Sequence, residues 1–292
     1  MDLTEAILML LFSEPINANS VDVPSITLQS AANITSGGTA YTLKGGNVTS
    51  MNSLLLRILL DQEDLNIIMR HVDLLRNVST TYISYPEVFL TDMYGNYITP
   101  EDPESAFRAT SFIDDVLRPR LLGFSINMTS GGLMLTFNET MDVSSLSFTS
   151  ISFQLSPTPV DPYYSFQLTG GELLSGIDNA EVYFRLTRFD LNELKVRGIG
   201  RSSNMIFIMI SNMTITDMVG LYAFPVTSLN TVSPEPFGPD EDIPYLESFQ
   251  LDLTSEELIL IFSEAIEEVD IRNVTLQSVR NIVIIFTLKN TV

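Results

Sequence analysis

The chain has 292 residues, a formal net charge of −21 and no cysteine. Its 15 basic residues are too few for the clustered positive surface that binding to nucleic acids or anionic membranes requires, and the lack of cysteine excludes disulfides and thiolate metal sites. A hydrophobic content of 45% excludes a disordered chain, yet no apolar run is long enough to span a membrane.

One strand pattern with an acid inside it occurs three times. It reads "LLFSEPINANSV" from Leu10, "LTFNETMDVSSL" from Leu135 and "LIFSEAIEEVDI" from Leu260, so each copy lies 125 residues after the previous one. A period of this length is the size of one ordinary domain. The chain is therefore predicted to be a tandem array with units at 1–118, 119–243 and 244–292. The opening segment aligns with 126–137 inside the second unit, so we expect Met1 to lie within a domain and any targeting segment to lie upstream.

Short alternating runs within each unit predict β-strands. In the second unit they are separated by Gly, Ser, Pro or Asn and cover 121–129, 132–141, 150–155, 164–171 and 181–187. Several short strands at this spacing are typical of an all-β, Ig-like sandwich. One short helix per unit follows these strands, with Asp64 or Asp190 as the expected N-cap.

Each unit is expected to close with a strand and a turn that contains an aspartate. These segments begin at Val88 and Met213 and place Asp92 and Asp217 at the turn. The proline- and acid-rich stretches 101–120 and 231–245 then read as extended, semi-rigid linkers between the units.

These motifs resemble a known family. The strand from Leu10, followed by "LTDMYGN" from Leu90, resembles the SbsA-type bacterial Ig-like domain (Big_5-like), whose repeats begin with Phe-Ser-Glu-Pro and end with Thr-Asp-x-x-Gly-Asn. The segments "TLKGG", "QLTGG" and "DLN" also resemble tandem repeats in extracellular proteins of aquatic microbial eukaryotes and sponges. The second unit departs from the pattern, since it has Asn138, Thr140 and Leu221 where the family has Ser, Pro and the final Asn. The resemblance implies surface layers, adhesins or extracellular fibres, and no enzymatic activity.

The residues themselves also predict that the chain is not an enzyme. Its single histidine, His71, has no cysteine partner and no nearby Ser/Asp pair, and no phosphate loop, nucleophile elbow or paired-histidine motif occurs. We therefore expect no required cofactor.

Asn-X-Ser/Thr sequons indicate an extracellular or cell-surface location with covalent glycans. Strand alternation predicts outward side chains at Asn127, Asn138 and Asn273. The alternative is that polar surface residues spell sequons by chance. The seven candidate glycosylation sites are Asn33, Asn47, Asn77, Asn127, Asn138, Asn212 and Asn273.

The repeated acids have two interpretations. Hard oxygen ligands could bind Ca²⁺ near the linkers, with Glu14, Asp92, Asp114, Asp115, Glu139, Asp217, Asp240 and Asp242 as the candidate ligands. Alternatively, the strand glutamates blunt an exposed edge strand, the turn aspartates bind their own backbone and the linker acids are solvated. The second interpretation is favoured, because no spacing matches a dedicated calcium motif.

The ends of the array suggest two ways of completing it. Unit one has no counterpart of the leading strand at 118–125, and the third unit holds only the first part of the pattern. Either covalent neighbours supply the missing parts, or a strand of one copy inserts into the next and builds a head-to-tail filament. The candidate assembly strand is Leu246, Glu247, Ser248 and Phe249.

Two functions remain open. The first is a structural subunit of a glycosylated extracellular fibril or appendage, without nucleic-acid partners or membrane insertion in this segment. The alternative is a calcium-dependent adhesin or carbohydrate-binding stalk, which would use the dissimilar loops 37–53 and 155–171 and the aromatic pair Tyr163 and Tyr164.

Overall fold

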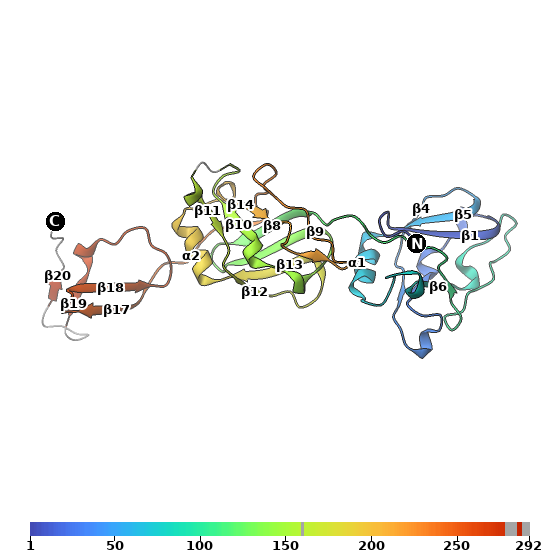
Figure 1. The fold of residues 1–292 in the computed structure, drawn as a ribbon, viewed down its shortest axis with the longest axis horizontal. Coiled ribbons are helices and arrows are strands. Elements are labelled where there is room, and N and C mark those ends of the chain that lie inside the picture. Colours follow the sequence, from blue (N-terminus) through green and yellow to red (C-terminus); the bar gives the residue numbers. More distant parts are fainter. Residues whose placement is uncertain (159–160, 278–284, 288–292) are drawn as a thin grey trace.

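The computed structural model describes residues 1–158, 161–277 and 285–287. It places three β-rich units in a row along the long axis (Figure 1). In this described part of the chain there are two α-helices, α1 (Gln62–Arg70) in the first unit and α2 (Arg188–Val196) in the second. The prediction of an all-β protein with one short helix in each of these two units is confirmed.

The first unit contains two sheets whose strand pairs are all antiparallel. One sheet has the order β1 (Ile7–Ile16), β5 (Ser53–Leu59), β4 (Asn47–Val48). The other has the order β3 (Ala40–Thr42), β2 (Thr27–Gln29), β6 (Tyr82–Ser84), β7 (Phe107–Arg108). Strand β1 is therefore an edge strand of its sheet.

The second unit has the same arrangement with more strands. Its larger sheet has the order β12 (Gly171–Leu173), β13 (Asn179–Leu186), β9 (Gly132–Asp142), β8 (Leu121–Asn127), β16 (Phe237–Gly238), and β15 (Thr216–Asp217) also pairs with β9. Its smaller sheet has the order β11 (Ser165–Gln167), β10 (Ile151–Gln154), β14 (Phe207–Ile210). The pair β8–β16 is parallel and the other pairs are antiparallel.

The third unit contributes two described antiparallel strand pairs. They are β17 (Leu246–Asp252) with β18 (Glu257–Phe262), and β19 (Thr275–Gln277) with β20 (Ile285–Thr287). Strand β17 is exposed along its whole length.

Matching elements in the first two units occupy matching places. Strand β9 begins 125 residues after β1, and each pairs with the strand that precedes its unit's helix. The difference is that β9 also pairs with the leading strand β8, so it is a central strand.

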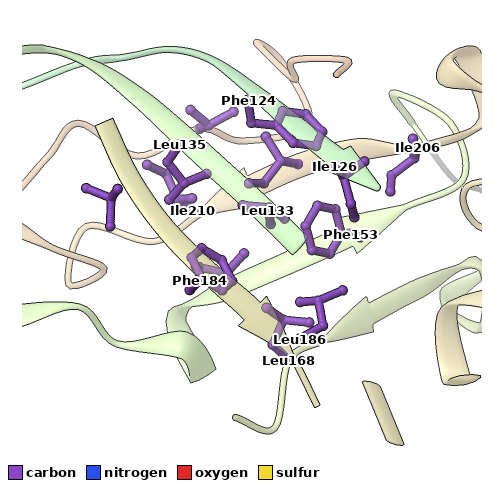
Figure 2. Close-up of a cluster of buried hydrophobic side chains, with 14 of the residues drawn as sticks. Phe124, Ile126, Leu133, Leu135, Phe153, Leu168, Phe184, Leu186, Ile206 and Ile210 are labelled. Carbon is purple, nitrogen blue, oxygen red and sulfur yellow. The ribbon is translucent and has the colours of Figure 1, made fainter. Parts of the chain in front are cut away.

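The core of the second unit forms as the alternation predicts. Leu133, Leu135 and Phe137 on β9 are each no more than 2% exposed, and the core around them includes Phe153 and Phe184 (Figure 2). Burying a side chain of this size stabilises the fold by about 1.5–3 kcal/mol. The first unit has a separate core of its own, so the two units are packed domains rather than halves of one.

The predicted N-caps are wrong by one turn. The N-cap positions are Asp61, whose side chain makes no capping hydrogen bond, and Thr187, which accepts the amide of Asp190. Asp64 and Asp190 lie inside the first turn, fully buried. The Oδ2 atom of Asp64 accepts the backbone N–H of Lys44 at 2.9 Å. These aspartates instead accept backbone N–H groups of the loop that contains Lys44 or Gly170. Sequence spacing alone cannot separate this role from that of an N-cap.

The linker prediction is wrong in part. Strand β7 lies inside the first predicted linker and pairs with β6, and β16 lies inside the second and pairs with β8. Arg118 further fixes the first linker, since its Nε donates to the Tyr222 carbonyl at 2.8 Å. Strands of two residues carry no readable alternation, which is why the sequence did not reveal them.

Candidate functional sites at the domain junctions

The first junction is formed by α1, the linker and the far end of β9. Thr140 Oγ1 donates to the Asn66 carbonyl at 3.2 Å, and Arg70 Nη2 donates to Asn179 Oδ1 at 2.9 Å. Met218 of the second unit also packs against the core of the first. These contacts join the two domains through hydrogen bonds and apolar packing.

Three carboxylates meet at this junction. Asp115 of the linker, Glu139 of β9 and Asp217 of β15 each offer an oxygen, and these oxygens lie within 4.8 Å of one another. Burial, as the largest cause, together with the neighbouring charges of Asp115 and Asp217, raises the pKa of Glu139 to about 8. Burial also raises the pKa of Asp115 and of Asp217. The cluster therefore holds negative charge poorly unless a proton or cation balances it.

Asp217 and its counterpart Asp92 form turns of the same shape. Asp217 Oδ1 accepts the N–H groups of Val219 and Leu221 at 2.8 and 2.9 Å. Asp92 Oδ1 likewise accepts from two amides of its own turn, at 2.7 and 2.8 Å. Each turn contains a glycine with φ near +90°, Gly95 or Gly220, a conformation that side chains disfavour. The interpretation of these acids as turn formers is confirmed.

The second oxygen distinguishes these two turns. Asp92 Oδ2 accepts the side-chain amide of Asn96 at 2.7 Å, and this bond is the main reason that the pKa of Asp92 is lowered. Leu221 stands at the position of Asn96 in the second unit. Asp217 is 2% exposed, and its Oδ2 has no hydrogen-bond partner among the described residues.

The second junction contains a lysine between two acids. Lys195 Nζ lies 2.7 Å from Asp240 Oδ2 and 2.6 Å from Glu264 Oε2. Burial disfavours the charge of Lys195, but hydrogen bonds and charge from both acids outweigh this effect and raise its pKa. Asp240 and Glu264 are the counterparts, 125 residues on, of Asp115 and Glu139.

Only some of the predicted calcium ligands lie close together in the structure. Asp115, Glu139 and Asp217 come together, whereas Asp240 pairs with Lys195 and Asp92 is occupied by its own turn. The remaining candidates are exposed and outside this cluster, namely Glu14, Asp114 and Asp242.

The three equivalent glutamates also differ. Glu14 is exposed, as an outward residue should be, while Glu139 and Glu264 are half-buried toward the end of β9 and just past β18. Lys195 was missed by sequence reasoning, although its place as the eighth residue of α2, matching Met69 in α1, is visible once the helices are aligned.

The sequon asparagines lie largely at the surface. Asn33 is half-buried, and the other six, which the sequence analysis names, are exposed. Several also support turns, as when Asn127 Oδ1 accepts the amide of Thr129 at 3.0 Å. Glycosylation at these sites stays a prediction.

The remaining candidate residues have simple surroundings. Leu246–Phe249 lie in β17, which pairs with β18 of the same chain. Tyr163 and Tyr164 are 47% and 40% exposed and contact each other edge to face, and Arg197 lies over the Tyr163 ring at 5.2 Å.

No protein-family model and no curated protein sequence matches the chain. Among solved structures, similarity is found to the N-terminal part of the bacterial S-layer protein SbsC, with 14% identity, a TM-score of 0.26, and coverage of 50% of this chain and 31% of that one. A structure of domains 1–6 of the same surface layer protein matches with 15% identity, a TM-score of 0.27, and coverage of 52% and 20%. The chain thus spans less than a third of the length of these proteins. Neither described helix has the length and apolar character of a membrane span.

Proposed function

We propose that the chain is a structural segment of an extracellular fibre or cell-surface appendage, built from tandem Ig-like domains that carry N-linked sugars. The observation that carries this proposal is the repetition of packed units joined by packed junctions in one row (Figure 1). Because neighbouring domains share hydrogen bonds and apolar contacts, they hold a preferred angle, as a fibre requires. The resemblance to SbsA-type repeats supports the same role.

The exposed sequon asparagines and the surroundings of His71 are consistent with this function. Asn127 and Asn138 are exposed on β8 and β9, where attached sugars would extend away from the core. His71 is half-buried and belongs to no cluster of metal-binding side chains among the described residues.

The free edge of β1 supports the head-to-tail variant of the proposal. Among the described residues no strand pairs with β1 on the side where β9 has β8, apart from single bridges at Ile7 and Ile16, and its Leu11 is 77% exposed. Beside it lies a mainly apolar cavity of about 490 Å³, bordered by Leu8, Leu10 and Ile83 among others. A strand with the pattern of β17, from a second copy, would complete the sheet by strand addition.

Electron microscopy of the native material tests the fibre, and mass spectrometry of its glycopeptides tests the sugars. We expect filaments with an axial repeat of one or two domains and glycan on the exposed sequons. Isolated flexible strings would contradict the fibre, and peptides free of glycan would contradict the decoration.

Strand addition has a separate test. A chain with Leu11→Cys and a chain with Phe249→Cys should form an intermolecular disulfide if β17 of one copy lies on β1 of another. A matched pair with Phe249→Cys and Val72→Cys, an exposed residue away from the edge, should not cross-link. Equal cross-linking in both pairs would contradict this variant.

An adhesive stalk is the alternative function. The exposed pair Tyr163 and Tyr164, with Arg197 beside it, is a surface on which a sugar ring could stack. Binding on a glycan array that Tyr163→Ala abolishes would favour this alternative over the fibre.

A further inference from the structure

The first junction contains a buried oxygen with no partner beside two other carboxylates. In the described chain, Asp217 Oδ2 accepts no hydrogen bond, although the side chain is almost fully buried. An unsatisfied buried acceptor costs about 1–3 kcal/mol, more if it is charged. Since Oδ1 is held by its own turn, Oδ2 is the atom left to meet Asp115 and Glu139.

The missing partner can be traced to one residue. In the first unit Asn96 donates its amide to the equivalent oxygen of Asp92, and Leu221 removes this donor in the second unit. The oxygen of Asp217 is therefore available to a ligand where that of Asp92 is not.

The second junction shows what balances the corresponding acids there. An ammonium group, that of Lys195, lies between Asp240 and Glu264. The eighth residue of α1 is Met69, which carries no charge, so the first junction has the two acids, a third one and no lysine.

The first junction contains a cavity large enough for one ion. A cavity of about 20 Å³ is bordered by Met69, Asp115, Glu139 and Thr140. About 10–15 Å³ is enough to hold one water molecule, so the space admits one ion but not a larger ligand.

The two nearby arginines do not pair with the three carboxylates. The charge of Asp217 favours the charged form of Arg76, but Arg76 Nη2 donates to the carbonyls of Met69 and His71 at 2.7 and 2.8 Å. Arg70 donates to Asn179. Among the described residues neither arginine forms an ion pair with the three carboxylates.

We propose that Asp115, Glu139 and Asp217 form a binding site for one hard divalent cation of the Ca²⁺ class, in the place that the ammonium of Lys195 occupies at the second junction. Ca²⁺ takes six to eight oxygen ligands, so the three carboxylates would be completed by water or nearby carbonyl oxygens. The ion would link the linker, β9 and β15, and with them the two domains. This inference goes beyond the structural role proposed above and does not depend on it.

Isothermal titration calorimetry of the full chain with CaCl₂ tests the proposal. The titration is run at about pH 8.5, because carboxylate ligands must lose their proton to bind metal. We expect one Ca²⁺ per chain. Met69→Lys should abolish binding by supplying the internal cation, and Leu221→Asn should weaken it by engaging Asp217 Oδ2.

Two further variants separate the site from general acidity. Asp217→Asn keeps the shape of the side chain and should lower the affinity at least about tenfold, since even changes behind the direct ligands have effects of this size. Glu14→Gln removes an exposed acid of equivalent position and should change nothing.

The proposal would be overturned if the wild-type chain bound no Ca²⁺, because a shared proton would then account for the cluster. It would also be overturned if Met69→Lys, folded by circular dichroism, bound Ca²⁺ as tightly as the wild type. A filament that forms equally well in chelator would leave the structural function intact while the calorimetry decides the site.

Discussion

The two junctions of this chain are built from the same parts and balanced in different ways. Each has a helix end, a linker aspartate and a glutamate at or just past the end of a strand, at matching positions. At the second junction a lysine inside the chain balances the acids, whereas at the first a methionine stands in its place. One helix residue therefore decides whether the charge of the acids is balanced by the chain itself or is left for a bound cation to balance.

This difference is independent of the fold, because both helices are anchored in the same way. Asp190 Oδ1 accepts the hydroxyl of Thr169 at 2.7 Å, and Asp64 Oδ1 accepts the hydroxyl of Tyr41 at the same distance. The device that positions the helix is shared, and the charge at its end is what varies.

The largest expected effect comes from removing that shared anchor. Asp190→Ala leaves the partly buried N–H groups of Thr169 and Gly170 without their charged acceptor, and we expect a loss of about 3 kcal/mol in the free energy of unfolding of the second unit. Asp64→Ala should destabilise the first unit by a similar amount. Urea denaturation, followed separately for each unit, measures both values.

The matched controls are Asp190→Asn and Asp64→Asn, which keep one acceptor oxygen and should lose about half as much. If one aspartate mattered and the other did not, the two units would not share this anchor.

The next effect concerns the lysine. Lys195→Met copies the first junction into the second and leaves Asp240 and Glu264 without their ammonium group. Breaking a fully buried pair costs about 3–5 kcal/mol, and since Asp240 is about one-third exposed, we expect about 2–3 kcal/mol in the docking of the third unit. Hydrogen exchange of residues 240–264 measures this loss.

The control is an exposed ion pair at the same junction. Glu247→Gln removes the charged contact with Arg188 at 2.7 Å, whose arginine side chain is 58% exposed, and should cost about 0–1 kcal/mol. Equal effects of the two variants would mean that burial does not distinguish the lysine.

The sequence predicted the parts of this architecture better than their contacts. The alternation of Leu133, Leu135 and Phe137 reports which face of one strand is buried, and this is a local property. The meeting of Asp115, Glu139 and Asp217 depends on how two domains and a linker fold back on one another, and spacing along the chain does not contain it.

Buried acids were the main source of error. Asp64 and Asp190 precede an apolar run, as N-caps do, but they satisfy a loop more than 15 residues away. A carboxylate with several possible partners cannot be assigned from its neighbours in sequence alone.

A smaller effect is expected across the first junction. Thr140→Val removes the bond from Thr140 Oγ1 to the Asn66 carbonyl, which should cost about 1 kcal/mol of domain docking. The substitution also destroys the sequon of Asn138, so the protein is produced without glycosylation. Thr140→Ser keeps the hydroxyl and should retain docking, as measured by hydrogen exchange of α1. Unchanged protection in Thr140→Val, or an equal loss in Thr140→Ser, would show that the hydroxyl bond does not hold the two domains together.

The smallest effect is a titration that compares the two turns. Asn96→Leu gives the first turn the residue of the second and removes the amide that lowers the pKa of Asp92. A lowered carboxyl pKa adds stability that is present above the ordinary pKa of Asp and is lost as the pH falls through the lowered value. In Asn96→Leu we therefore expect the Asp92 pKa, followed by nuclear magnetic resonance, to move up toward its ordinary value, and the part of the stability that Asp92 loses in acid to become smaller. An unchanged pKa would show that the turn amides alone hold the charge of Asp92, and Leu221 would then no longer explain why Asp217 differs.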